Sequence, residues 1–354
     1  MKVAVIGAGL SAAAAVEVLK AQGCQLTVFE KSRGPGGRFS SKRVGQALVS
    51  PGEAGQPGYA DFGAQYFTAR APAFLQQLQQ WQQQQQVGLW PEVIYCYDKA
   101  GLRPSPDQQQ RFIAVPQLQQ LLKPVFSAVE TRYNSRITEL SFVHDRTPAG
   151  SWQLATEDGE LFSGFDALLL TCPAQQSRQL LTGAALVSQI PPQPLLPCWA
   201  VLLELAEATS HPADAIFIRH QVLRFAARQN DKPGHLAFSL SHHATEPAEQ
   251  WLVHLTAGAS AALLDASSDE VIAAAAEALS EVLAYPLKVQ AALAHRWLYA
   301  SYDDAVPPCG VLFDQKLRLA LAGDWTLGGR VENAWLSGQQ AAALLLNGKP
   351  GASS

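Results

Sequence analysis

The first 30 residues constrain the fold more than any other part of the chain. They begin with "KVAVIG", a run typical of a buried parallel strand, continue through an Ala-rich stretch with helical spacing, and end in "QLTVFE". The turn between strand and helix, residues 7–12, reads "GAGLSA" and fits the GxGxxG/A fingerprint. Strand, tight turn, helix and strand form a βαβ unit, so we expect a Rossmann-like α/β fold.

The small residues of this turn suit dinucleotide binding. Gly7 permits the tight turn, Gly9 lets a pyrophosphate approach the backbone, and Ala12 allows close helix–strand packing. The helix that follows, with Ser11 in its first turn, offers unpaired N–H groups and a positive dipole end to phosphates. Glu30 ends the second strand, at the position where an acid binds the ribose 2′-OH in dinucleotide-binding folds. This favours FAD or NAD over a cofactor that carries a 2′-phosphate. A glycine turn without a ligand is the alternative.

A cationic loop with three glycines, "KSRGPGGRFSSKR", follows Glu30. Net charge is −4, so these cations are a local feature, and the chain lacks the basic balance of a nucleic-acid-binding protein. We expect the loop to run beside the pyrophosphate, with Lys31, Gly37 and Arg38 as cofactor-binding residues. A solvated basic loop is the alternative.

The strand-to-helix pattern returns near the end of the chain. "LRLALAGD" is a strand that ends in Gly323-Asp324, and a helix is expected from about Gly329. In flavoproteins of the amine oxidase and p-hydroxybenzoate hydroxylase type, such an acid binds the ribityl chain or the phosphates. The helix start, with Arg330 and Val331, would face the flavin and stabilise negative charge on its reduced form. Solvation of the helix end is the alternative role for Arg330.

Between these motifs the sequence mixes helices and strands. Phe74, Leu78 and Trp81 share one helical face, which predicts an amphipathic helix in the Gln-rich residues 73–90. Ser267 or Ser268 is expected to cap a long Ala-rich helix. Strands are expected at 136–145, 151–159, 165–173, 199–206, 236–240 and 251–256.

Five blocks resemble the renalase family, and most closely its bacterial members. They are "GAGLSA", "KSRGPGGRFSSKR", "DFGAQYFTAR", "AHRWLYA" and "AGDWTLGGRVENAWLSGQQAA". The resemblance runs nearly end to end and is weakest over residues 200–260. It implies noncovalent FAD and the oxidation of 2- or 6-dihydro isomers of NAD(P)H. Hydride would pass to flavin N5, NAD(P)+ would leave, and O2 would reoxidise the flavin to give hydrogen peroxide.

Hydride transfer needs a flat, apolar slot against the flavin and no obligatory acid or base. We expect Tyr66 and Phe67 to wall this slot, with Trp297 opposite, although core packing is the alternative for each aromatic. His254 would line the pocket rather than act as an acid or base. The candidate substrate-binding residues are Gln65, Tyr66, Phe67, Thr68, His254 and Trp297, and we add Gly63, Ala64 and Ile137 to the cofactor site.

Composition excludes several other classes. The five cysteines are scattered without a CxxC pair, which argues against a disulfide framework and a zinc site and fits a reducing, cytoplasmic setting. The N-terminus could pass for a signal peptide, but Glu17 and Lys20 interrupt its apolar stretch. No apolar run approaches the roughly 18 residues of a membrane span.

We therefore expect two discontinuous domains with a ligand at their interface. Residues 1–72, 130–175 and 290–354 would form a Rossmann-like FAD-binding domain, and residues 73–129 and 176–289 a mixed-sheet substrate domain. Two rival functions stay open: a flavin amine oxidase and a non-catalytic FAD-binding redox protein. Gly328-Gly329-Arg330 places a cation where amine oxidases carry an aromatic, which suits an amine substrate poorly.

Overall fold

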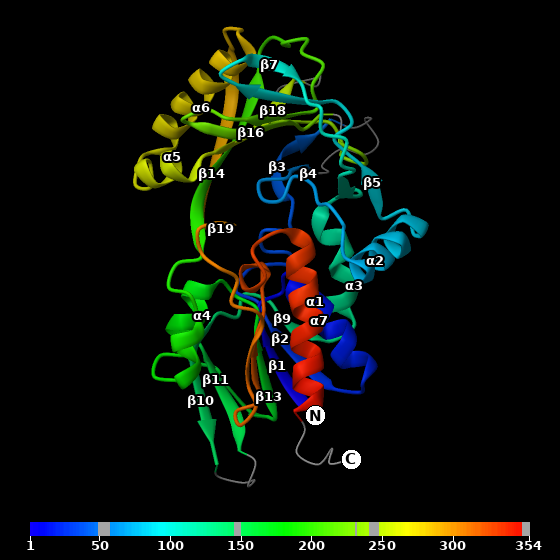
Figure 1. The fold of residues 1–354 in the computed structure, drawn as a ribbon, viewed down its shortest axis with the longest axis vertical. Helices are drawn as coiled ribbons and strands as arrows, with labels where there is room; N and C mark the ends of the chain where they lie inside the picture. The colour runs from blue at the N-terminus through cyan, green and yellow to red at the C-terminus, as the bar shows by residue number, and fades with distance from the viewer. Residues whose placement is uncertain (49–56, 145–149, 231, 241–247, 349–354) are drawn as a thin grey trace.

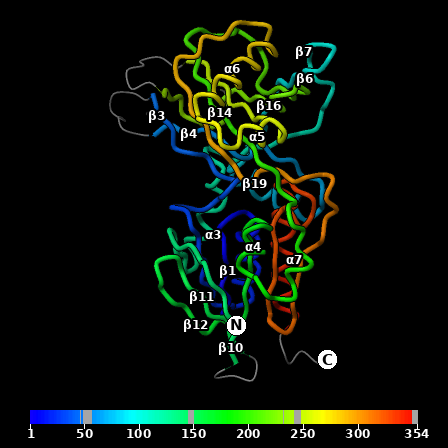
Figure 2. The backbone as a smooth tube through the Cα atoms, turned by 90° about the vertical axis from the view of Figure 1, so that its left-hand side faces the viewer, coloured from blue at the N-terminus to red at the C-terminus, as the bar shows by residue number. Residues whose placement is uncertain are grey.

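The computed structural model describes residues 1–48, 57–144, 150–230, 232–240 and 248–348. The molecule is elongated, with a lower body built around a parallel sheet and an upper body built around a larger mixed sheet (Figure 1). Figure 2 shows the two bodies stacked along the long axis, with β1 and α7 in the lower half and β14 and α6 in the upper half. The α/β architecture predicted from the sequence is confirmed.

The lower sheet has the order β20-β21-β13-β1-β2-β9. All of its strands run parallel except β20, which pairs antiparallel with β21. Alternate residues of β1 bury into opposite layers, because Val3 and Val5 join one core cluster whereas Ala4 and Ile6 join the other. The strands are β1 (Lys2–Ile6), β2 (Gln25–Phe29), β9 (Glu130–Arg132), β13 (Ala167–Leu170), β20 (Leu312–Asp314) and β21 (Leu319–Leu321).

Helices cover one face of this sheet. α1 (Leu10–Ala21) and α7 (Val331–Asn347) lie side by side, with α3 (Lys123–Ser127) and α2 (Pro72–Gln83) beside them (Figure 1). The amphipathic helix predicted for residues 73–90 is confirmed over Pro72–Gln83, where Phe74, Leu78 and Trp81 are its buried residues. The last part of the prediction was wrong, because the helix ends at Gln83 and Val87–Leu89 forms a strand. α7 begins at Val331, slightly later than expected. A methyl group at Gly338 would collide with the Ser11 carbonyl oxygen, so this glycine permits contact between the two helices.

The opposite face is covered by a three-stranded antiparallel sheet, in which the predicted pairing of the 136–145 and 151–159 strands is confirmed. Trp152, Leu154 and Phe165 of this sheet pack in the same cluster as Ile6 and Trp325. The elements on this side are β10 (Ile137–Val143), β11 (Ser151–Thr156), β12 (Leu161–Phe165), α4 (Ala174–Leu180) and the 3-10 helix Ala185–Gln189.

The upper sheet has the order β19-β14-β18-β16-β15-β6-β7 and is antiparallel except between β15 and β6. Its outer face packs against α5 (Ala257–Ala262) and α6 (Ser268–Leu283) (Figure 1). Ser267 caps α6 and forms a capping box with Glu270, as predicted. The strands are β6 (Ile94–Asp98), β7 (Gly101–Pro104), β14 (Leu195–Leu205), β15 (Ala215–Ile218), β16 (Leu223–Arg228), β18 (Gln250–Leu255) and β19 (Val289–Tyr302).

The inner face of the upper sheet meets a small sheet, whose residues Val44, Ala60 and Phe238 pack with Ala200 and Leu202. This small sheet contains β3 (Lys42–Ala47), β4 (Pro57–Ala60) and β17 (Phe238–Ser239), so only part of the strand expected at 236–240 forms. The remaining short elements are β5 (Val87–Leu89), β8 (Phe112–Ala114) and the 3-10 helices Leu118–Leu121 and Asp324–Thr326.

Several segments lie differently from the expected domain division. Residues 290–302 were expected in the FAD-binding domain, but β19 pairs along β14 in the upper sheet. β3 and β4 also belong to the upper body, because β3 pairs with β17. Conversely, α3, expected with the substrate domain, packs against α1 in the lower body. The chain crosses between the bodies several times, and local patterning does not reveal which body a segment joins.

Candidate functional site

A cleft of about 1560 Å³ runs between the two bodies. Its lower wall is formed where β1, β2, β13 and β21 end, and its upper wall is the inner face of the seven-stranded sheet. Ligands of open α/β sheets bind outside the carboxyl ends of the parallel strands, so this cleft is the expected place for a dinucleotide. The ligand site was predicted at the interface between the two bodies, and the residues of the sequence motifs line a cleft there.

The first strand-to-helix corner lines the cleft with Gly7, Gly9 and Ser11. Gly7 adopts φ +103°, a conformation that favours glycine, and its missing side chain leaves room for Thr171. At Gly9 a side chain would meet no chain atom closer than 3.9 Å, so the space beside it is open to a ligand. Ala12 is buried beneath the corner. These features fit a pyrophosphate at this position.

Glu30 lines the same part of the cleft and is 7% exposed. Its Oε2 accepts a hydrogen bond from the Ala8 N–H at 2.8 Å, and its Oε1 accepts one from the Ser32 N–H at 2.8 Å. An ionised carboxylate has roughly four acceptor sites, so two backbone bonds leave capacity for ribose hydroxyls. Glu30 thus also fixes the backbone of both loops that surround the candidate cofactor site.

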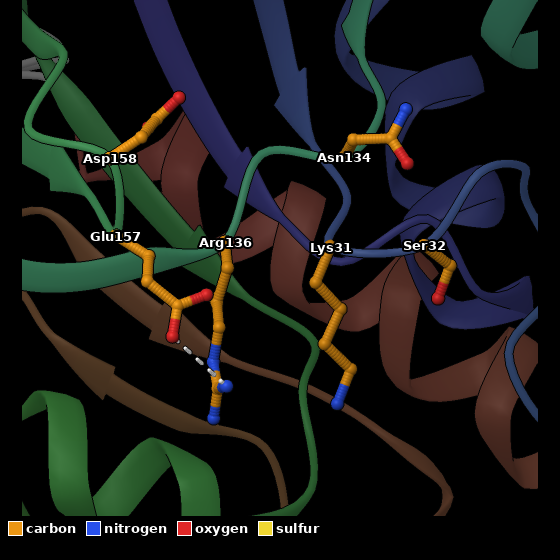
Figure 3. Close-up of a pocket in the computed structure, with 6 residues that line it drawn as sticks. All are labelled: Lys31, Ser32, Asn134, Arg136, Glu157 and Asp158. Carbon is orange, nitrogen blue, oxygen red and sulfur yellow. Dashed lines mark hydrogen bonds and ion pairs between the residues drawn. The ribbon is translucent and has the colours of Figure 1, made fainter.

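The cleft continues past Glu30 into an outer pocket of about 490 Å³ (Figure 3). Lys31, Ser32 and Asn134 line one side, and Arg136 and Glu157 form an ion pair of 3.5 Å on the other. Ile137, a predicted cofactor-binding residue, lines the cleft directly after Arg136. This end has the space for an adenosine.

The glycine-rich cationic loop packs against the first corner. The Gly36 N–H donates to the Ala8 carbonyl at 2.8 Å, and Gly37 and Arg38 line the cleft. Gly63 is required here because a methyl group on it would collide with the Arg38 carbonyl oxygen, and the Ala64 N–H donates to that oxygen at 3.0 Å. The predicted residues Gly37, Arg38, Gly63 and Ala64 are therefore brought together.

The C-terminal motif joins the same site through two polar contacts. The Arg38 guanidinium binds both carboxylate oxygens of Asp324, at 2.9 and 2.5 Å, so Arg38 contacts this acid directly. The Ser337 hydroxyl lies 3.0 Å from that of Ser11 and accepts a hydrogen bond from the Gly323 N–H at 3.0 Å. This contact of Ser337 has no local signal in the sequence, because its partner Ser11 lies 326 residues away.

The start of α7 faces the cleft with Gly328, Gly329, Arg330 and Val331. Arg330, the residue before the helix, has φ +74° and ψ 151°, a region occupied almost only by glycine. Such strain costs about 1–3 kcal/mol and occurs mainly at functional sites. The helix start therefore combines a strained backbone, a positive dipole end and a cation beside the candidate cofactor site.

The aromatic block 65–68 lies differently from the prediction. Phe67 is 2% exposed and packs in the core against Phe39, Phe74 and Phe112, so it does not wall the cleft. Tyr66 packs against Phe217 and Phe225, and Thr68 is half-buried. The core-packing alternative describes these aromatics better, because the chain turns inward directly after the lining residues Gly63 and Ala64.

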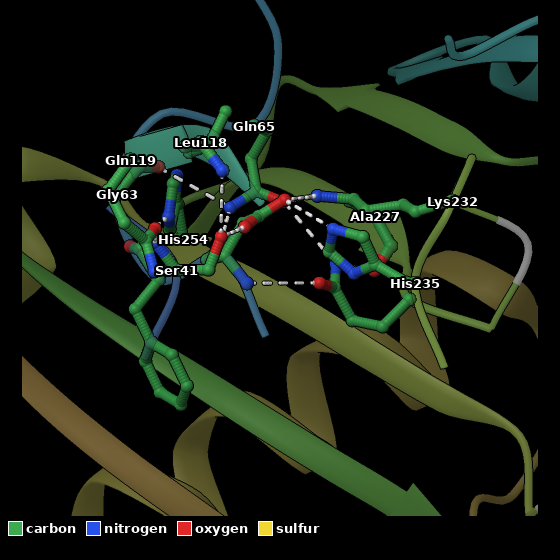
Figure 4. A network of polar contacts seen from close by, with 12 residues as sticks. Ser41, Gly63, Gln65, Leu118, Gln119, Ala227, Lys232, His235 and His254 are labelled. Atoms are coloured by element: carbon green, nitrogen blue, oxygen red, sulfur yellow. Dashed lines mark hydrogen bonds and ion pairs between the residues drawn. The ribbon is translucent and has the colours of Figure 1, made fainter. Parts of the chain in front are cut away.

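Gln65 belongs to a buried polar network rather than to the cleft (Figure 4). Its side-chain amide donates to the Asp61 carbonyl, and its Oε1 accepts from the Lys232 ammonium at 3.1 Å. Lys232 also binds the Asp61 carboxylate at 2.8 Å, and both side chains are fully buried. Burial favours the neutral acid, but the charges of Lys232 and His235 hold the pKa of Asp61 below its usual value. These contacts hold in place the segment from Asp61 to Gln65, which contains the cleft-lining residues Gly63 and Ala64.

The upper wall of the cleft carries His254, His295 and Trp297. The Nε2 of His254 and the Nε1 of Trp297 each lie 3.0 Å from the Phe62 carbonyl oxygen. Because a carbonyl only accepts, the His254 Nε2 carries the proton and its Nδ1 is free to accept. Burial and the charge of Arg224 lower the pKa of His254 to about 3, so His254 is a neutral pocket-lining group.

Three further observations concern metal sites, thiols and membrane-spanning helices. Among the residues that the structure describes, no three His, Cys, Asp or Glu side chains gather in an arrangement that would hold a metal ion. The five cysteines are free thiols, and Cys198 lines the cleft opposite Trp297, with which it pairs in the sheet. No helix of the described chain combines the length and apolarity needed to cross a membrane.

Comparison with known proteins places this geometry among flavoproteins. The family described as NAD(P)-binding Rossmann-like domain matches residues 5–81, and that described as flavin containing amine oxidoreductase matches residues 107–346. A cyclohexylamine oxidase from Brevibacterium oxydans IH-35A has a similar structure, with TM-score 0.69, 12% identity and 98% coverage of both chains. An engineered putrescine oxidase matches with TM-score 0.69, 10% identity and coverage of 98% of this chain and 99% of its own.

Proposed function

The chain belongs to the flavin containing amine oxidoreductase family with FAD as its cofactor, and from this premise we propose that it oxidises dihydronicotinamide dinucleotides. The proposed substrates are the 2- or 6-dihydro isomers of NAD(P)H, as in the renalases that the sequence resembles. Bound FAD would accept a hydride from the substrate, and O2 would then take the electrons and yield hydrogen peroxide. NAD(P)+ would be the organic product.

The main support for this proposal is the excess of positive charge along the cleft. Its lining contains many more Lys and Arg side chains than acids, and the acids are Glu30, Glu157, Asp304 and Asp324. Of these, Glu30 binds backbone N–H groups, Glu157 pairs with Arg136, and Asp324 pairs with Arg38. A cleft of this sign attracts anions and repels cations. A phosphate-bearing dinucleotide fits it better than an ammonium ion does.

The protein groups at the upper wall would bind and orient the substrate. Trp297 offers a flat apolar surface whose N–H is already occupied by the Phe62 carbonyl, so the ring can face the cleft without losing a hydrogen bond. His254 would present its unprotonated Nδ1 as an acceptor, suited to an amide N–H. Neither group needs to move a proton, which agrees with hydride transfer.

An amine oxidase is the rival that the two structural neighbours favour, since one is a cyclohexylamine oxidase and the other a putrescine oxidase. A protonated amine would need a carboxylate or an aromatic cage near the flavin. Among the described residues that line the cleft, the acid that follows the β19 wall residues most closely in the sequence is Asp304. Its side chain is exposed. The position before α7 is the cation Arg330. These features weigh against amine binding.

The non-catalytic rival would require a filled or closed substrate space. In the described residues the cleft extends beyond the cofactor corners to Cys198, His254 and His295 on the upper sheet. A second ligand therefore has room in the cleft beyond the residues that would hold FAD, which supports an enzyme rather than a simple FAD carrier.

Anaerobic stopped-flow mixing tests the proposal. The FAD-loaded protein is mixed with 2-dihydro or 6-dihydro NADH, with ordinary 4-dihydro NADH, or with cyclohexylamine or putrescine. We expect rapid loss of oxidised-flavin absorbance with at least one unusual isomer and slow or no loss with the others. Reduction by the amines alone would favour the amine oxidase, and no reduction by any compound would favour the non-catalytic reading.

A further inference from the structure

Lys42 and His295 form a cationic contact at the upper end of the cleft. Lys42 begins β3 and His295 lies in β19, and the Lys42 Nζ is 2.8 Å from the His295 Nδ1. Both residues line the cleft. The cofactor-binding motifs are on the lower body, so this contact lies on the side of the cleft left for a second ligand.

The contact fixes which hydrogens remain available. An ammonium group only donates, so the His295 Nδ1 must accept and the proton of the neutral ring is on Nε2. Burial, and then the charge of Lys42, lower the pKa of His295 to about 4, so the ring stays neutral near pH 7. Two ammonium N–H groups of Lys42 and the His295 Nε2–H are left as donors.

The charge of Lys42 has no carboxylate partner in the described chain, where no Asp or Glu lies within ion-pair distance of it. Its nearest compensation comes from the rings of Trp297 and Phe62, with centroids 5.7 and 5.8 Å from Nζ. The side chain is half-buried, and burial lowers its pKa. A half-buried cation held between two aromatic rings and a neutral imidazole is a site that an anion would stabilise.

Two more cationic side chains add positive charge to the part of the cleft that contains Lys42 and His295. Arg43 and Arg224 also line the cleft, and neither has an ion-pair partner among the residues described. Arg224 lies on β16, close enough to His254 for its charge to lower the pKa of that ring. The anion would therefore sit beneath a positive wall on the upper sheet.

We propose that Lys42 and His295 form an anion-binding subsite that takes a phosphate of the substrate. This inference rests on the proposed function and deepens it, because it says how a dinucleotide would be distinguished from a phosphate-free dihydropyridine. The subsite would act on binding of the substrate, and the hydride-transfer step would not depend on it.

The test compares substrates that differ in phosphate content. Lys42→Met removes the charge and keeps much of the length, Lys42→Arg keeps the charge, and Lys99→Met is a control at an exposed turn outside the cleft. Flavin reduction is followed anaerobically with the 2- or 6-dihydro isomers of NADH, of the nicotinamide mononucleotide and of an N-alkyl nicotinamide. The apparent Kd and the limiting rate are measured for each.

We expect Lys42→Met to weaken binding of the two phosphate-bearing substrates by about tenfold to a hundredfold, the usual effect of losing a hydrogen bond to a charged group. The N-alkyl compound should change less than about twofold, and the limiting rates should stay close to wild type. Lys42→Arg should recover part of the loss. Equal weakening of all three substrates would overturn the proposal, because it would show a merely structural role.

A second measurement keeps this test separate from the proposed function. Inorganic pyrophosphate is titrated into the oxidised, FAD-loaded wild-type and Lys42→Met proteins while the flavin spectrum is recorded. Saturable binding that Lys42→Met weakens supports the anion subsite even if no dihydropyridine reduces the flavin. Identical titrations of the two proteins, or no binding to either, would overturn the subsite whether or not the enzyme oxidises dihydronicotinamides.

Discussion

Arg38 and Asp324, which come from opposite ends of the chain, form a two-pronged ion pair with N–O distances of 2.9 and 2.5 Å. Arg38 also donates to the Ala300 carbonyl at 2.9 Å, so one guanidinium ties together the glycine-rich loop, β19 and the C-terminal motif. Asp324 is only 12% exposed. The two corners that the cofactor must span are thus held against each other by charge.

Asp324→Ala should greatly weaken FAD binding while the protein still folds. The change removes a carboxylate from the cofactor cleft and releases Arg38, and charged hydrogen bonds of this kind contribute about 1.5–3 kcal/mol. The measurement is the FAD-to-protein ratio of the purified protein, which should be yellow when wild type. Asp314→Ala, at the end of β20 and outside the cleft, is the matched control. A full complement of flavin in Asp324→Ala would refute the assignment.

Lys232→Met should destabilise the protein by about 3–5 kcal/mol, because it leaves the fully buried Asp61 carboxylate without its ion-pair partner. Adding Asp61→Asn should restore part of this stability, since the amide carries no charge. Urea unfolding of the single and double variants measures the effect, with Lys316→Met as a surface control. A double variant less stable than Lys232→Met would contradict this account of the network.

Stability should fall as the pH drops below about 6.5, in part because of His254. Burial lowers the pKa of this ring from 6.5 to about 3 in the folded state, so only the unfolded chain takes up the proton between these values. Each pH unit in this window then costs up to about 1.4 kcal/mol. His254→Gln should flatten the dependence of the unfolding free energy on pH, whereas His144→Gln at an exposed position should not. Parallel pH curves for wild type and His254→Gln would exclude this contribution.

Arg330→Gly should be more stable than Arg330→Ala by about 1 kcal/mol or more. Both variants lose the guanidinium, but only glycine adopts φ +74° and ψ 151° without strain. The comparison uses thermal unfolding midpoints at saturating FAD, so that the loss of side-chain charge cancels. Equal midpoints would mean that the backbone before α7 stores no strain.

The sequence predicts the features that depend on local spacing. The corner at Gly7 and Gly9, the amphipathic helix with Phe74 and Trp81, and the capped helix after Ser267 each follow from residues close together in the chain. The lining positions of Glu30 and Asp324 follow from the same logic, because an acid at the end of a parallel strand faces the ligand edge of the sheet.

The features that the sequence does not predict depend on distant partners. The contact between Lys42 and His295 joins residues 253 positions apart, and the pair of Asp61 and Lys232 joins residues 171 apart. Phe67 was misplaced for a related reason. An aromatic that closely follows cleft-lining residues can face either the cleft or the core, and packing against Phe74 and Phe112 decides between them.

The central claim is tested most directly by an anaerobic titration of the FAD-loaded protein with one dihydro isomer of NADH at a time. We expect one equivalent of the 2- or 6-dihydro isomer to bleach one equivalent of flavin and yield one equivalent of NAD+. Admission of air should then restore the colour and produce hydrogen peroxide. If the flavin stays oxidised with both isomers but is bleached by an amine with formation of the aldehyde, the account is contradicted.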